Sequence, residues 1–145
     1  MSQENVEIVR RLYEAMNSAG VAAIYNLPDA ERKRVFEQWF SPSFEIRQDE
    51  DLVFDTKGTF RGYEGFVESA RELVEAFSDL RFEPSTTYES GDTVVFEVRA
   101  LATGRGSGVL TEIPQFAHLW ELKDGLVRRW YVYKTVKEAL AAAGM

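Results

Sequence analysis

His118 is the single histidine of the chain and the residue whose type most readily does proton chemistry. An imidazole has an ordinary pKa of about 6.5, so it can take up or release a proton near neutral pH. It lies in the alternating stretch FAHLWELKDG, with Phe116 and Trp120 two residues to either side. Side chains two residues apart share one face of a strand, so we expect these three rings to point the same way.

Glu97 and Arg99 are the other candidates for chemistry, two residues apart in DTVVFEVRALATG. If they face inward, a cluster with His118 under aromatic walls would make a general acid–base site, in which His118 carries the proton and Arg99 polarises an oxygen. The simpler interpretation is a solvated strand face, because the alternate residues of this strand are apolar. For His118, the simpler alternative is a residue that lines a pocket or makes a structural hydrogen bond.

The other local patterns do not indicate a metal or a cofactor. One histidine with scattered carboxylates is weak evidence for a transition-metal site. The acidic stretch RQDEDLVFD lacks the glycine that a calcium loop needs. GRGSG lies between two predicted strands, so no helix N-terminus follows it to hold a phosphate. We therefore predict no metal and no cofactor.

Composition narrows the class of protein. The chain has 145 residues, which suits one domain over residues 1–145, and it has no cysteine, which excludes disulfides and thiolate sites. The net charge of −7 argues against nucleic acid or an anionic membrane as a partner. No apolar run is long enough to span a membrane, and the first residues do not resemble a signal peptide, so we expect a cytoplasmic protein.

Hydrophobic periodicity predicts helices first and strands later. The predicted helices cover residues 2–20, 28–40, 62–79 and a short tail from 136, and the predicted strands cover residues 44–49, 80–90, 92–104, 108–124 and 126–136. This order predicts an α+β fold with helices packed on one face of a curved antiparallel sheet, a cone that leaves an apolar cavity.

Several phrases in this order resemble the SnoaL-like branch of the nuclear-transport-factor-2-like superfamily, which includes ketosteroid isomerases. The phrases are ENVEIVRRLYEAMN, FSPSFEIR, FRGYEGFVESARELVEAF, GDTVVFEVRALATGRGSG, FAHLWELKDGLVRRW and KEALAAAG. Only YNLPDAERKRVFEQ looks longer than the usual connection of the family. The resemblance implies a cone-like fold with a pocket and a homodimer formed through the outer face of the sheet.

The catalytic residues of the ketosteroid isomerases are not retained here. Their tyrosine in the first helix matches Leu12, with Tyr13 next to it, and their aspartate base matches Gln48, with Asp49 next to it. Their protonated aspartic acid matches His118. The resemblance therefore gives no support for that reaction.

Other activities of the superfamily fit no better. Epoxide hydrolases need an arginine, which Arg99 matches, and an acid on the last strand, where this chain has Val132. Dehydratases use two histidines, and SnoaL-type cyclases use an aspartate where this chain has His118. The predicted pocket is lined by residues of the first helix and of the strands: Leu12, Tyr13, Met16, Gln48, Phe116, Trp120, Trp130 and Val132.

These observations leave three functions open. The first is a cofactor-independent isomerase, cyclase, dehydratase or hydrolase with His118 as acid or base. The second is a non-catalytic protein that binds a small, largely apolar molecule in the same pocket. The third is a dimeric interaction module whose cavity is filled by side chains.

Overall fold

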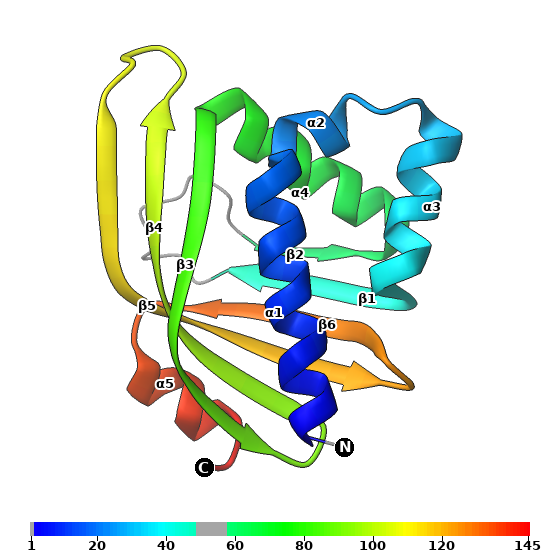
Figure 1. Cartoon of the computed structure of the whole chain (residues 1–145), viewed down its shortest axis with the longest axis vertical. Coiled ribbons are helices and arrows are strands. Elements are labelled where there is room, and N and C mark those ends of the chain that lie inside the picture. Colours follow the sequence, from blue (N-terminus) through cyan, green and yellow to red (C-terminus); the bar gives the residue numbers. More distant parts are fainter. Residues whose placement is uncertain (1, 49–57) are drawn as a thin grey trace.

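Six strands form one curved sheet in the computed structural model, which describes residues 2–48 and 58–145 (Figure 1). The elements in chain order are α1 (Ser2–Ala19), α2 (Val21–Tyr25), α3 (Asp29–Trp39), β1 (Phe40–Gln48), β2 (Gly58–Arg61), α4 (Gly62–Ala76), β3 (Phe77–Ser90), β4 (Thr93–Gly104), β5 (Leu110–Lys123), β6 (Leu126–Tyr133) and α5 (Val136–Ala142). The strand order is β2-β1-β6-β5-β4-β3. Neighbouring strands are antiparallel except for β1 and β6, which are parallel.

The apolar face of α1 covers the concave side of the sheet. Val9, Leu12, Tyr13 and Met16 recur every three or four residues and are buried, as expected for one face of an amphipathic helix. Figure 1 shows α1 crossing the sheet on one side and α5 packing on the other, where it covers a second, smaller apolar cluster. The expected α+β architecture, helices on a curved sheet, is confirmed.

The curvature has a local cause in two neighbouring β-bulges. Ser85 and Thr86 of β3 lie opposite a single residue of β4, and Pro114 and Gln115 of β5 lie opposite Arg99. A bulge bends its strand and increases its twist. Because the two bulges are side by side, β3, β4 and β5 bend at the same level and wrap around α1.

Several element boundaries differ from the sequence-based predictions, and three of the differences are instructive. The Ser41–Ser43 stretch was expected to separate a helix from a strand, but β1 begins at Phe40 and runs through it. Its pairing with β6 is irregular there, which is where a strand tolerates proline. β2, predicted as loop, is a four-residue edge strand with little hydrophobic alternation. α4 ends at Ala76, so β3 begins at Phe77 rather than at Leu80.

Asn17 fastens the end of α1 to the edge of the sheet. Its side-chain nitrogen donates to the carbonyl of Phe82 at 2.7 Å, and the amide of Phe82 donates to its side-chain oxygen at 2.9 Å. β3 is an edge strand, so these backbone groups have no neighbouring strand on that side. The side chain of Asn17 thus substitutes for a strand partner at an otherwise open edge.

We expect Asn17→Ala to lower the free energy of unfolding by about 2 kcal/mol, because two half-buried backbone groups lose their partners. Urea denaturation measures the change. The matched control is Ser18→Ala, at the exposed neighbouring position, for which we expect a change within about 0.5 kcal/mol. Equal stabilities of the two variants would show that the hydrogen bonds of the Asn17 side chain contribute nothing to the stability of the fold.

Candidate functional site

His118 lies at one end of a buried hydrogen-bonded chain whose central member is Tyr13. The Tyr13 hydroxyl is 2.7 Å from Nδ1 of His118, and the indole Nε1 of Trp120 donates to the same hydroxyl at 2.9 Å. An indole N–H can only donate, so the Tyr13 oxygen accepts from Trp120 and its own proton is available for Nδ1. This pattern assigns the neutral tautomer of His118 with its hydrogen on Nε2.

The surroundings of His118 keep it uncharged. Only 1% of the residue is exposed. The rings of Phe82, Phe116, Trp120 and Trp130 have centroids 5.2–5.7 Å from that of the imidazole. Burial among these rings lowers the pKa of His118 to about 3, because the imidazolium would lose its hydration without gaining an anionic partner. His118 is therefore a neutral donor and acceptor at physiological pH.

This low pKa makes stability depend on pH. The unfolded chain protonates His118 below a pH of about 6.5, whereas the folded chain stays neutral until about pH 3. Unfolding then takes up a proton, so the free energy of unfolding falls by about 1.4 kcal/mol for each pH unit below about pH 6. We expect His118→Gln, whose amide oxygen can still accept from Tyr13, to lose this slope between pH 6 and pH 5. Chemical denaturation across that range measures it, and parallel curves for the two proteins would contradict a neutral His118.

The predicted cluster of Glu97, Arg99 and His118 does not form. Strand alternation places Glu97 and Arg99 on the convex side of the sheet, whereas His118 faces α1 on the concave side. Arg99 instead lies at the bend, where its guanidinium pairs with Glu83 and with Glu112, each at 3.0 Å. Of the two orientations left open by the sequence, the solvated face is the one observed.

A cavity of about 380 Å³ lies between the helices and the concave face of the sheet. Its walls are aliphatic and aromatic except for Gln38, and none of the lining residues is charged. The lining residues are Leu12, Ala15, Met16, Ala19, Val21, Ala23, Ile24, Leu27, Val35, Gln38, Trp39, Phe40, Phe66, Ala70, Leu73, Phe82 and Trp130. Ala19, Ala23 and Gln38 are exposed, which places the mouth of the cavity beside α2 and α3.

Sequence reasoning missed one wall of this cavity. Ile24, Leu27, Val35, Gln38 and Trp39 border it from α2, α3 and their connection. They lie in or next to the segment that looks longer than the usual family connection. The extra length of this segment was the signal in the sequence that could have revealed the wall. An added segment whose apolar residues recur at regular spacing must pack them against another part of the protein.

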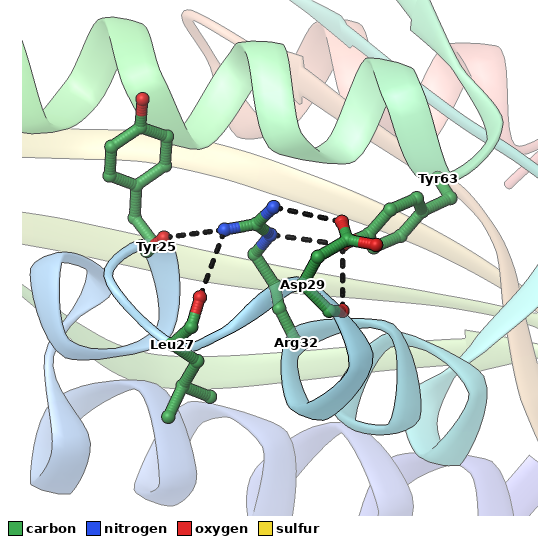
Figure 2. A network of polar contacts seen from close by, with 5 residues as sticks. All are labelled: Tyr25, Leu27, Asp29, Arg32 and Tyr63. Carbon is green, nitrogen blue, oxygen red and sulfur yellow. Dashed lines mark hydrogen bonds and ion pairs between the residues drawn. The ribbon is translucent and has the colours of Figure 1, made fainter.

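Arg32 holds this wall together (Figure 2). Its guanidinium donates to the carbonyls of Tyr25 and Leu27 at 2.8 and 3.1 Å, to Asp29 at 3.1 Å, and to the Tyr63 hydroxyl at 3.0 Å. Tyr63 in turn donates to the Asp29 carboxylate at 2.9 Å. The network joins the carbonyl end of α2, the start of α3 and the start of α4. With 16% of its side chain exposed, Arg32 is largely shielded from competing water.

We expect Arg32→Lys to loosen the wall without unfolding the protein, because an ammonium cannot make four bonds in the fixed geometry of a guanidinium. Hydrogen–deuterium exchange should show faster exchange over residues 21–29, with the exchange of β4 and β5 unchanged. Arg34→Lys, at an exposed position of the same helix, is the matched control. Unchanged exchange in both variants would mean that the network does not restrain the wall.

A smaller void of about 20 Å³ lies beside His118. Gln48, Trp130 and Val132 border it together with His118, and so do Ile46, Leu73 and Phe82. Leu73, Phe82 and Trp130 also border the large cavity, so the two spaces adjoin.

The residues predicted to line the pocket separate into two groups. Leu12, Met16 and Trp130 border the large cavity, and Gln48, Trp130 and Val132 border the small void. Tyr13, Phe116 and Trp120 border neither space and belong to the packed core. The reason is that a pocket wall and a core draw on the same residue types, and only packing separates them. Asp49 lies outside the described residues.

Two findings bear on other kinds of site. Among residues 2–48 and 58–145, no group of three or more histidine, aspartate or glutamate side chains could hold a metal ion. Within the same ranges, no helix has the length and apolar character needed to cross a membrane.

The fold and the buried site define the class of protein: a cone of helices on a bent sheet, with an apolar cavity at the concave face. The model of the SnoaL-like domain matches residues 9–130. The chain therefore belongs to the SnoaL-like family. No curated protein sequence matches it.

Solved structures agree with this fold. The chain is similar to an NTF2-like protein of unknown function from Burkholderia pseudomallei, with 19% identity, 97% of each chain covered and a TM-score of 0.72. It is similar to TerC, co-crystallised with polyporic acid, with 18% identity, 98% and 99% covered and a TM-score of 0.71. A putative SnoaL-like polyketide cyclase from Jannaschia sp. shares 21% identity, with 98% and 92% covered and a TM-score of 0.69.

Proposed function

We propose that this protein binds a neutral, largely apolar small molecule in the cavity between the four N-terminal helices and the sheet. The observation that carries this proposal is the cavity itself, about 380 Å³ with walls of apolar side chains and a single polar one, Gln38. Such a volume and lining are typical of small-molecule sites, which lie between about 300 and 1,000 Å³.

The size and charge of the cavity limit its ligand. A cavity of about 150 Å³ holds benzene, so this one accommodates roughly 15 non-hydrogen atoms, the size of a molecule with two fused rings and a short substituent. None of the lining side chains is charged. A carboxylate or an ammonium would lose its hydration there without gaining a counter-ion, so the ligand is uncharged.

The alternatives receive less support. An interaction module with a filled cavity does not fit a space of about 380 Å³. Acid–base catalysis by His118 stays a prediction, but a base with a pKa of about 3 is poorly matched to proton transfer near pH 7. Likeness of fold to TerC, which was co-crystallised with polyporic acid, supports a small-molecule role.

The expected homodimer and the expected cytoplasmic location stay predictions. Part of the outer face of the sheet is covered by α5 of the same chain. The remainder carries ion pairs such as Arg99 with Glu83 and Arg61 with Glu45. A dimer through this face would therefore bury α5 and charged side chains.

Filling the cavity tests the proposal. We expect Ala15→Phe to weaken binding of 2-acetylnaphthalene, an uncharged two-ring probe, by at least about tenfold, because the new ring occupies the ligand's volume. Equilibrium dialysis measures the affinity. Ala142→Phe adds the same ring at an exposed position of α5 and controls for non-specific binding. Failure of the unmodified protein to bind this probe, or equal binding by both variants, would overturn the proposal.

A further inference from the structure

Among the described residues that border the large cavity, Gln38 has the one side chain that readily accepts a hydrogen bond. The other lining side chains are aliphatic or aromatic, apart from the thioether of Met16, which is a weak acceptor. The indoles of Trp39 and Trp130 can only donate, and that of Trp130 is buried without a partner within residues 2–48 and 58–145. A hydrogen donor that enters the cavity therefore meets a single strong side-chain acceptor on these walls, the Oε1 atom of Gln38.

The helical period places Gln38 on the cavity side of α3. Val35 and Trp39 also border the cavity, and the three positions together span only about 100° around the helix. Gln38 is exposed, so its side chain lies at the mouth. Arg32 on the same helix bonds to four groups, whereas the Gln38 amide makes no hydrogen bond to another residue in the described part of the chain. This amide is therefore available to a ligand.

We infer that Gln38 determines which apolar molecules the cavity selects, by accepting a hydrogen bond from a hydroxyl group at the outer end of the ligand. The apolar skeleton occupies the cavity, and the hydroxyl stays at the mouth. This inference rests on the proposed function and narrows it to a class of ligand, the neutral alcohols and phenols of about two-ring size. Gln38 is then a specificity-determining residue of the binding site.

The polarity of the walls decides which end of such a ligand enters first. A hydroxyl among the apolar walls would lose its hydrogen bonds to water, whereas at the mouth Gln38 replaces one of them. A ketone or ether oxygen only accepts, and the donors on these walls include two indoles as well as the Gln38 amide. The glutamine therefore matters most for a ligand group that has a hydrogen to donate.

A matched pair of probes tests this role. 2-Naphthol and 2-methylnaphthalene have nearly the same shape, but the methyl group of the second has no hydrogen to donate. 2-Naphthol is a phenol and stays uncharged at pH 7. Equilibrium dialysis gives the ratio of the two affinities for each protein. The hydration of the free probes is the same in every experiment, so a change in this ratio between variants reports the contact of the hydroxyl with the altered side chain.

The variant Gln38→Met keeps the length of the side chain and removes its amide. We expect the ratio to shift about fivefold against 2-naphthol, which corresponds to about 1 kcal/mol and is typical of one hydrogen bond. Gln38→Glu keeps an acceptor and should preserve or increase the original ratio. Gln3→Met makes the same change at an exposed position of α1 away from the cavity and should leave the ratio unchanged.

A second measurement needs no variant. In the unmodified protein we expect a nuclear Overhauser contact between the side-chain amide hydrogens of Gln38 and the ring hydrogens next to the hydroxyl of bound 2-naphthol. Absence of this contact in the saturated complex would place the hydroxyl elsewhere and overturn the role of Gln38.

The outcomes separate the two proposals. Binding of neither probe would overturn the binding function and the role of Gln38 with it. Binding of both probes with the same ratio in the unmodified protein and in Gln38→Met would overturn the role of Gln38 alone and direct attention to Gln48 at the small void. A ratio that shifts as much in Gln38→Glu as in Gln38→Met would also overturn it, because the glutamate still accepts a hydrogen bond.

Discussion

The buried hydroxyl of Tyr13 is the constraint on which the rest of the site depends. A hydroxyl placed among aromatic rings must be hydrogen-bonded, and here it bonds to two residues of β5, His118 and Trp120. These bonds fix the rotation of α1 on the sheet. Neighbouring helical positions are about 100° apart, so once Tyr13 points at β5, Leu12 is turned toward the cavity.

Burial decides what His118 is able to do. A lone imidazole suggests a proton carrier, but a carrier needs a pKa near neutrality, and burial without an anionic partner moves this pKa far below it. The predicted partners, Glu97 and Arg99, face the opposite side of the sheet, where Arg99 pairs with Glu83 and Glu112. The surroundings of His118 on the concave face are thus apolar, and its polar contact there is a hydrogen bond rather than an ion pair.

The cavity exists because the helices cover the sheet without filling the space at its concave side. α1 and α4 supply two walls, and the short α2 and α3 bridge them, held by the donors of Arg32. The helical wall is joined by polar bonds at its edge, while its inner surface stays apolar. A wall of two short helices depends on such contacts, because helices of this length have little stability of their own.

The sequence by itself determined the order and type of most elements, because amphipathic helices and alternating strands differ in period. It also determined the shared face of Phe116, His118 and Trp120, since alternation along one strand is a local property. It did not indicate β2, whose four residues are too few to show a clear alternation.

Only the tertiary structure decided which inward residues form core and which border the cavity. Tyr13 and Leu12 look alike as apolar positions of one helix, yet Tyr13 packs against β5 and Leu12 borders the large cavity. The orientation of Glu97 and Arg99 followed from which face of the sheet α1 covers, a choice made by contacts between residues about a hundred positions apart. Local patterns report period and polarity, whereas the pKa of His118 and the unpaired N–H of Trp130 depend on neighbours that only folding brings together.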